Sequence, residues 1–248
     1  MSRMMISEKI RKISIIEYYM IRIYGDSHSI HSFRPIQESS SLTLSCKHTH
    51  TGLAPTWYTH IPVEHCKHYY AGSTTMHRIG RDNIIIGYDK NEVNTNDIVV
   101  LSYGEIDCRC HIHRQINDNG RNEDDVIHEL THNYFRTIRN NRENQTTIIV
   151  GVIPPTKRLD FESLNGPILH ELPFVGTDED RSRYTKKVNA LLEELSNKHG
   201  YHYFNPYSHY MREDGTLKYE LSDSCVHLGD AWFFLDRFIE LYTSISCP

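Results

Sequence analysis

Short apolar runs rich in β-branched and aromatic residues recur along the chain and predict buried strands. Ile15 to Tyr24 is the first of these runs. Asp97 to Tyr103 and Thr146 to Ile153 have the same character, and Tyr201 to Pro206 is a shorter fourth run. Runs that are apolar throughout are typical of parallel strands with both faces covered.

Longer amphipathic segments lie between these runs and predict helices. Asp124 to Arg139 carries apolar residues at helical spacing on one face. A second helix is expected after Thr177, which forms a capping box with Asp180, and Gly200 suits the end of that helix. Gly229 to Ser244 predicts the last helix.

The alternation of strands with helices predicts one α/β domain over residues 1–248, with a parallel sheet covered on both faces. Thr75 to Gly80 begins a further helix, and Lys157 to Gly176 is predicted to be a long loop. Ligands of such sheets bind at the carboxyl ends of the strands, so chemistry-bearing residues there are the candidates for a site.

Composition narrows the classes of function. A formal net charge of -5 gives no electrostatic reason to expect a nucleic-acid partner. No stretch reaches the roughly 18 apolar residues of a membrane span, and no signal peptide is visible at the N-terminus. We therefore expect a cytoplasmic protein with no membrane partner, whose six cysteines are reduced thiols.

Three short segments at strand ends and near the C-terminus have the residue types of a nucleophilic site. Ser27 follows the first strand in a Gly-Asp-Ser turn, and His227 lies four residues after Asp223. A serine needs a base to take its proton and a third group to orient that base, which His227 and Asp223 would supply. The alternative is that Ser27 only caps the helix after the turn.

These residues, in this order with the Gly104-Glu105-Ile106-Asp107 turn, resemble the SGNH (GDSL-type) hydrolase family. The resemblance implies a three-layer α/β/α, flavodoxin-like fold and ester hydrolysis through an acyl-Ser27 intermediate, with no cofactor and no metal. It also implies an oxyanion hole formed by the backbone N–H groups of Ser27 and of a glycine, for which Gly72 is our choice and Gly80 the alternative.

Two features depart from the family pattern. Its third block reads Gly-x-Asn-Asp, and Ile106 occupies the place of the asparagine, whose amide would donate to the oxyanion. Arg109 is the nearest cation in sequence that could substitute, while structural pairing with Glu105 or Asp107 is the rival role for it. The family's last block reads Asp-x-x-His, whereas three residues separate Asp223 from His227, so a bulge is expected.

Glu105 and Asp107 lie in the same turn, beside Arg109. We assign them to substrate binding. The equally weighted alternative is a structural cluster of ion pairs that fixes the turn to its neighbours.

Two further patterns invite a zinc site. His128-Glu129-Leu130-Thr131-His132 matches the His-Glu-x-x-His signature of metallopeptidases, but no third ligand follows on a second helix. Cys46 to His68 is dense in cysteine and histidine without the spacing of a zinc finger. The alternatives, a solvated helix face and a polar loop, are preferred.

The sequence therefore predicts a serine esterase acting on an acyl ester, with an O-acetyl group on a carbohydrate as the expected substrate. Trp57, Tyr58, Tyr69 and Tyr70 suggest a surface for a sugar-sized ligand. Glycan O-acyltransfer by the same residues is one alternative. A catalytically reduced module that binds glycans or a protein is another, supported by Ile106, and a zinc peptidase is the third.

Overall fold

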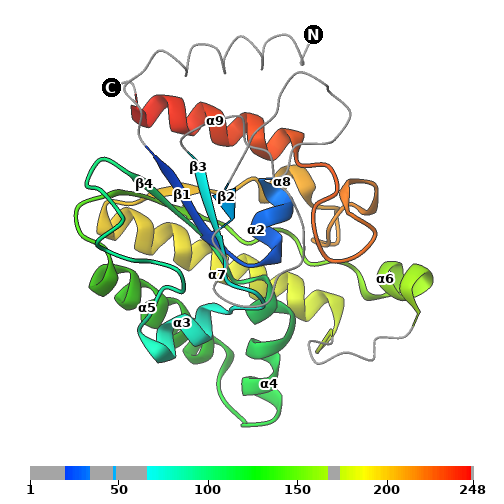
Figure 1. Ribbon diagram of the computed structural model, residues 1–248. Helices are drawn as coiled ribbons and strands as arrows, with labels where there is room; N and C mark the ends of the chain where they lie inside the picture. Colours follow the sequence, from blue (N-terminus) through cyan, green and yellow to red (C-terminus); the bar gives the residue numbers. More distant parts are fainter. Residues whose placement is uncertain (1–19, 34–46, 49–65, 167–173, 247–248) are drawn as a thin grey trace.

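The computed structural model describes residues 20–33, 47–48, 66–166 and 174–246 (Figure 1). The strands are β1 (Ile21–Gly25), β2 (Lys47–His48), β3 (Cys66–Tyr70), β4 (Ile98–Ser102), β5 (Thr146–Val150) and β6 (His202–Phe204). They form one sheet in the order β2-β3-β1-β4-β5-β6, and every pairing is parallel. Without the two-residue β2, this is the flavodoxin-like order.

Helices connect the strands and follow the last of them. They are α2 (Ser27–Ser32), α3 (Met76–Asp82), α4 (Ile112–Asn117), α5 (Glu123–Asn141), α6 (Arg158–Asn165), α7 (Asp178–His199), α8 (Tyr207–Tyr210) and α9 (Trp232–Ser246). A π-helical segment, η1 (Asp107–His111), precedes α4, and a 3-10 turn, η2 (Tyr219–Leu221), precedes the loop before α9. Among the described residues, no helix is long and apolar enough to cross a membrane.

Two apolar clusters cover the two faces of the sheet. Val99, Leu101 and Ile149 pack on one face against α3, α5 and α7, whereas Val100 and Ile148 pack on the other against α8 and α9. Figure 1 shows the resulting layers, with α9 and α2 on one side of the strands and α3, α5 and α7 on the other. The predicted three-layer α/β/α architecture with a flavodoxin-like parallel sheet is confirmed.

Where the structure describes them, the predicted strands and helices match the observed elements to within a few residues, and residues 15–19 of the first predicted strand lie outside the described residues. The capping box of Thr177 and Asp180 opens α7, and Gly200 ends it with a φ of 67°. One prediction is wrong: the segment from Lys157 to Gly176 is not all loop, because α6 lies within it. None of the residues of α6 is buried, so this helix lacks the core-facing side by which the other helices were predicted.

Candidate active site

Ser27 stands at the junction of β1 and α2, where a parallel strand gives way directly to a helix. Asp26 is the N-cap of α2, and its carboxylate accepts the backbone N–H of His28 at 2.9 Å. The helix starts so close to the sheet that a β-carbon on Gly25 would lie 2.2 Å from Ser29 Oγ and 2.7 Å from the Ser102 carbonyl. Glycine at this position therefore permits the turn that presents Ser27 at the carboxyl end of the sheet.

Asp223 and His227 share the loop that precedes α9. One oxygen of Asp223, Oδ1, accepts the backbone N–H groups of Cys225 at 2.9 Å and of His227 at 3.1 Å. The other oxygen, Oδ2, lies 2.8 Å from His227 Nδ1. Ser224, which lies between the acid and the histidine, takes a positive φ of 66°.

The two segments meet at Ser27, 200 positions from His227 in sequence. Ser27 Oγ lies 2.9 Å from His227 Nε2, so serine, histidine and aspartate form one hydrogen-bonded chain. An ionised Asp223 only accepts, so the Nδ1 of His227 carries the proton and the Nε2 accepts from the Ser27 hydroxyl.

The ionisation of the pair suits this hydrogen-bonded chain. Burial lowers the pKa of His227, and neighbouring His28 lowers it further against the opposite effect of Asp223. Burial works to raise the pKa of Asp223, but the hydrogen bond and charge interaction with His227, together with the backbone N–H groups of Cys225 and His227, outweigh it and bring that pKa to about 2. At neutral pH the imidazole is therefore neutral and the aspartate is charged.

Two further histidines of α2 surround His227, and sequence reasoning missed their role. The ring of His31 stacks on that of His227 at 4.1 Å, and its Nδ1 lies 3.7 Å from Asp223 Oδ2. The ring of His28 lies 4.5 Å from that of His227. His31 lies four residues after Ser27, which is the helical spacing that places two side chains on one face, so this signal was present in the sequence.

Glu105 and Arg109 form a buried ion pair next to the hydrogen-bonded chain of Ser27, His227 and Asp223. Arg109 Nε donates to Glu105 Oε1 at 2.8 Å, and Glu105 Oε2 contacts His28 Nε2 at 2.8 Å. Burial alone would raise the pKa of Glu105, yet Arg109 and His28 hold it below its usual range. Both side chains are almost fully buried, so the structure gives Arg109 the pairing role that was the alternative to an oxyanion contact, and Glu105 does not face a substrate.

Asp107 also turns inward, which corrects its assignment to substrate binding. Its side chain is completely buried, and its two oxygens accept the backbone N–H groups of Met76 at 2.7 Å and of His77 at 3.1 Å. Burial raises the pKa of Asp107 to about 7. The carboxyl group fastens the first turn of α3 to the turn after β4.

The two candidate oxyanion glycines have different surroundings. Gly72 has a φ of 64° and follows Ala71, whose N–H donates to the Gly25 carbonyl at 3.0 Å, so it lies at the strand ends beside the serine turn. Gly80 is buried in α3, where a β-carbon would lie 2.8 Å from Asn133 Cβ of α5. Gly80 is thus a close-packing position between helices, and Gly72 remains the candidate.

The side chain at position 106 cannot replace the family's asparagine. Ile106 is buried, at 3% exposure, and has no polar atom beyond its backbone.

The contacts of the His-Glu-x-x-His segment give no support to a zinc site. Glu129 of the His-Glu-x-x-His match pairs with Arg121 at 2.5 Å, while the rings of His128 and His132 stack at 3.7 Å. Most of the segment from Cys46 to His68 lies outside the described residues, as do Trp57 and Tyr58.

One group of side chains in the described part of the chain could hold a metal ion. His31, Asp223 and His227 each offer a ligand atom, and these atoms lie within 4.8 Å of one another. Two of the three are already joined to Ser27 through the hydrogen-bonded chain. A metal there would compete with the proton on His227 Nδ1.

Comparisons with known proteins show which solved structures share the fold of this chain. No known family and no curated protein matches the sequence. Among solved structures, a GDSL-like lipase from Bacteroides thetaiotaomicron VPI-5482 aligns with a TM-score of 0.50 at 12% identity, covering 97% of this chain and 96% of its own. A Streptococcus pneumonia protein whose description refers to platelet activating factor aligns with a TM-score of 0.54 at 14% identity, covering 97% of this chain and 92% of its own. The protein therefore has the SGNH hydrolase-like α/β/α fold of the GDSL-type hydrolases.

Proposed function

We propose that the protein is a serine esterase that hydrolyses an acyl ester through an acyl-Ser27 intermediate. The observation that carries the proposal is the hydrogen-bonded chain, with 2.9 Å from Ser27 Oγ to His227 Nε2 and 2.8 Å from His227 Nδ1 to Asp223 Oδ2. A nucleophile within reach of a base, and a base oriented by an acid, are the geometric requirements of nucleophilic catalysis.

In the first half-reaction, Ser27 Oγ attacks the carbonyl carbon while His227 Nε2 takes the hydroxyl proton. The carbonyl double bond becomes a single bond to a negatively charged oxygen. Collapse of this intermediate breaks the bond to the alcohol oxygen, and the imidazolium returns its proton to that oxygen. Asp223 keeps its charge throughout and stabilises the imidazolium.

In the second half-reaction, water takes the place of the serine hydroxyl. His227 accepts a proton from the water, the resulting hydroxide attacks the acyl carbon, and Ser27 leaves with the proton from the imidazolium. The products are a carboxylic acid and the free enzyme. An alcohol that occupied the position of the water would give acyltransfer by the same steps.

Backbone groups are the proposed oxyanion donors. The first N–H groups of a helix have no acceptor within it, and Asp26 occupies only that of His28, so the N–H of Ser27 is one donor. The N–H of Gly72 is the second. Because Ile106 contributes no side-chain donor, we expect turnover to be slower than with a complete hole, by on the order of 10²–10³.

The proposed substrate is an O-acetyl ester of a carbohydrate. Among the aromatic residues that suggested a sugar surface, Tyr69 is buried against Tyr24 and bonded to Arg22, so it belongs to the core. Tyr70, at the end of β3, is partly exposed. Its pKa is raised first by partial burial and then by the nearby carboxylate of Asp26. We propose that Tyr70 lines the rim of the acyl site.

Active-site labelling tests the proposal. A fluorophosphonate probe should form one adduct, located on Ser27 by mass spectrometry, and Ser27→Ala should abolish both labelling and hydrolysis of a short aryl ester. Ser73→Ala, at an exposed serine of the same sheet edge, is the matched control and should leave both unchanged.

Absence of labelling in the wild type, or equal labelling of Ser27→Ala, would contradict the esterase and favour the binding-module alternative. If added sugar accelerates release of the aryl alcohol and becomes acylated itself, acyltransfer is the activity instead.

A further inference from the structure

The ring of His227 lies against side chains of α2, the helix that also carries Ser27. The ring of His31 stacks on it with 4.1 Å between ring centres and an angle of 11° between the ring planes. The ring of His28 lies 4.5 Å away and is tilted by 49°. The nucleophile and the two neighbouring rings therefore come from one short helix, whereas the base comes from the loop before α9.

The two hydrogen bonds of the His227 ring fix its position more firmly than its orientation. They hold Nδ1 2.8 Å from Asp223 Oδ2 and Nε2 2.9 Å from Ser27 Oγ. Rotation of the ring about the line through these two nitrogens keeps both distances and changes the hydrogen-bond angles, on which the strength of the bonds depends. A parallel ring against one face of the imidazole opposes that rotation by steric contact.

His31 also reaches the acid that orients the base. Its Nδ1 lies 3.7 Å from Asp223 Oδ2, the same oxygen that contacts His227 Nδ1. The side chains of His31 and Asp223 are each 21% exposed, and that of His227 is 15% exposed. The hydrogen bond between Asp223 and His227 thus lies near the surface, and the His31 ring covers part of the approach of water to it.

His28 has a second attachment that His227 does not share. Its Nε2 contacts Glu105 Oε2 at 2.8 Å, and Glu105 pairs with Arg109. Replacement of His28 would therefore disturb a buried ion pair as well as the contact between rings. His31, whose ring is parallel to that of His227, is the residue on which the orientation of the base can be tested.

We propose that His31 is a positioning residue for the esterase, because its ring keeps the plane of His227 in the orientation that directs Nε2 at Ser27. The inference rests on the proposed acyl transfer, in which His227 Nε2 takes the serine proton and later returns it. A misplacement of about 1 Å can cost on the order of 10² in rate. His31 acts through His227, so its loss should lower kcat and leave KM nearly unchanged.

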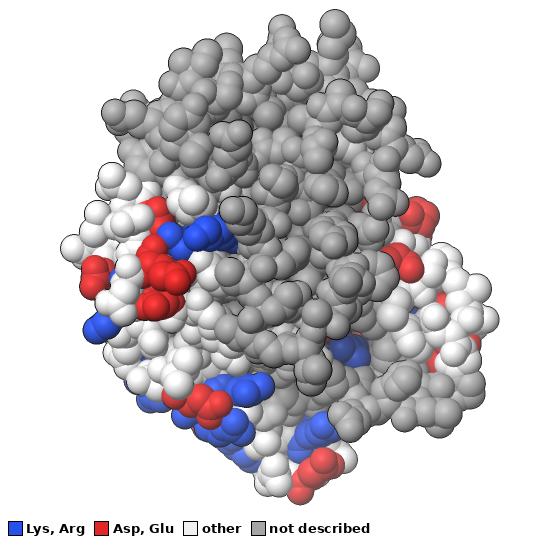
Figure 2. Space-filling view, in the orientation of Figure 1, with Lys and Arg blue, Asp and Glu red and all other residues white. Residues whose placement is uncertain are grey.

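Long-range charge is a weaker candidate for this orienting role. On the face drawn in Figure 2, basic and acidic side chains of the described residues lie close to one another, so their fields largely cancel at a distance. Salt screens what remains, whereas contact between two rings does not depend on ionic strength. The ratio of the wild-type kcat to that of a His31 variant should therefore be the same at low and at high salt.

Two replacements of His31 separate the flat ring from the volume that it fills. His31→Leu has an apolar side chain without a ring and should lower kcat by at least about tenfold. His31→Phe restores a ring and should stay within about threefold of the wild type. Each kcat is referred to the number of sites counted by complete fluorophosphonate labelling of Ser27, so that a loss of folded protein is not taken for a loss of rate.

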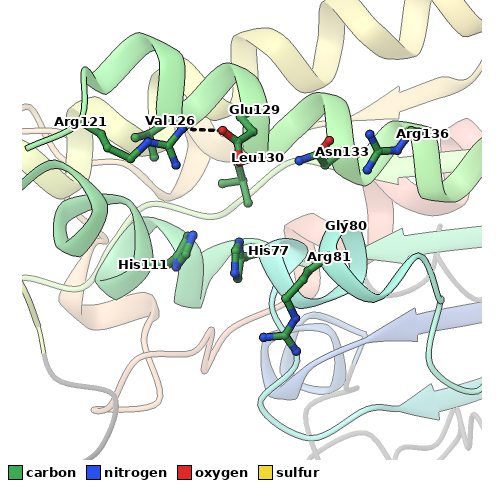
Figure 3. Close-up of a pocket in the computed structure, with 10 residues that line it drawn as sticks. All are labelled: His77, Gly80, Arg81, His111, Arg121, Val126, Glu129, Leu130, Asn133 and Arg136. Carbon is green, nitrogen blue, oxygen red and sulfur yellow. Dashed lines mark hydrogen bonds and ion pairs between the residues drawn. The ribbon is translucent and has the colours of Figure 1, made fainter. Parts of the chain in front are cut away.

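A second pair of stacked histidines supplies the matched control. His77 of α3 and His111 at the end of η1 are also half-buried, and their rings lie 3.9 Å apart at 30°. Figure 3 shows them along one side of a pocket whose other side is α5, and neither Ser27 nor His227 lines this pocket. His77→Leu removes a stack of the same kind and should leave kcat unchanged.

Proton NMR adds a readout that needs no turnover. The Nδ1 proton of His227, in its hydrogen bond to Asp223, should give a low-field signal that Asp223→Asn removes. The signal should be sharp in the wild type and in His31→Phe. In His31→Leu it should broaden, because the proton exchanges with water more quickly.

These measurements let the esterase and the positioning role fail separately. If Ser27 is not labelled, the proposed esterase is wrong, and the NMR signal still decides whether His31 holds the His227 ring. With Ser27 labelled, the positioning role is overturned if His31→Leu keeps the kcat of His77→Leu or keeps a sharp signal. Equal losses in His31→Leu and His31→Phe, or a loss that shrinks at high salt, would overturn it as well.

Discussion

Removing Arg109 should destabilise the fold rather than slow the chemistry. Its guanidinium and the carboxylate of Glu105 are 9% and 4% exposed, and Nε to Oε1 is 2.8 Å. Breaking a buried pair by deleting one partner costs about 3–5 kcal/mol, because a charge is left without compensation. Glu105 keeps its contact with His28, so we expect the lower end of that range.

The expected change can be measured by thermal unfolding. A loss of about 3 kcal/mol lowers the Tm of a protein of this length by about 6–12 °C. Arg109→Met preserves the aliphatic packing and isolates the charge. The matched control is Arg158→Met, because Arg158 and Glu162 have the same i,i+4 spacing and the same 2.8 Å distance but are 52% and 27% exposed. Exposed pairs contribute about 0–1 kcal/mol, so the control should change Tm by a few degrees at most.

A second substitution tests why Arg109→Met loses stability. Glu105→Gln combined with Arg109→Met removes both charges, so the double variant should recover part of the stability that Arg109→Met loses. The kcat of folded Arg109→Met should remain within about tenfold of the wild type. Equal Tm losses in Arg109→Met and Arg158→Met would refute this reasoning, and a large fall in kcat at unchanged Tm would return Arg109 to the oxyanion hole.

Two pH dependences follow from the buried groups. His227 must be neutral to accept the proton of Ser27, and burial together with His28 lowers its pKa. We therefore expect kcat/KM to reach half its maximum below pH 6.5, and a midpoint above that value would contradict the assignment of His227 as the base. Asp107 has a pKa raised to about 7 by burial, so the folded protein holds a proton that the unfolded chain has lost, and stability should decline as the pH rises from 5 to 8. Asp107→Asn cannot titrate and should show a shallower decline in Tm over that window, whereas parallel curves would show that Asp107 does not contribute.

The parts of the fold that depend on local chemistry could be predicted from the sequence. The capping box at Thr177, the glycine end of α7 at Gly200 and the uniformly apolar strands β4 and β5 each follow from neighbouring residues alone. The helix α6 was not predicted in this way, since none of its residues is buried and its N-cap, Lys157, makes no side-chain capping hydrogen bond.

The candidate site was predictable only in part, because tertiary contacts decide which way a polar side chain turns. Ser27, Asp223 and His227 were identified by residue type and order, and the structure brings them together. The residue type of Asp107 is equally suited to binding a substrate, so the sequence does not show which way its carboxylate turns. Only the packing of α3 against the turn after β4 shows that it faces inward. The spacing of His31 from Ser27 places both on one face of a helix, but that His31 stacks on His227, 196 positions away, could be seen only in the structure.

The junction between β1 and α2 limits how the active site can be re-engineered. The contact that a β-carbon at position 25 would meet in Ser102 is a backbone carbonyl of the adjacent strand, which cannot rotate aside as a flexible side chain would. Randomised libraries that include this position would consist mostly of misfolded members. Changes of substrate range are better started at the proposed rim, where Tyr70 is partly exposed, a β-carbon at Gly72 would meet nothing within 4 Å, and the serine turn stays intact.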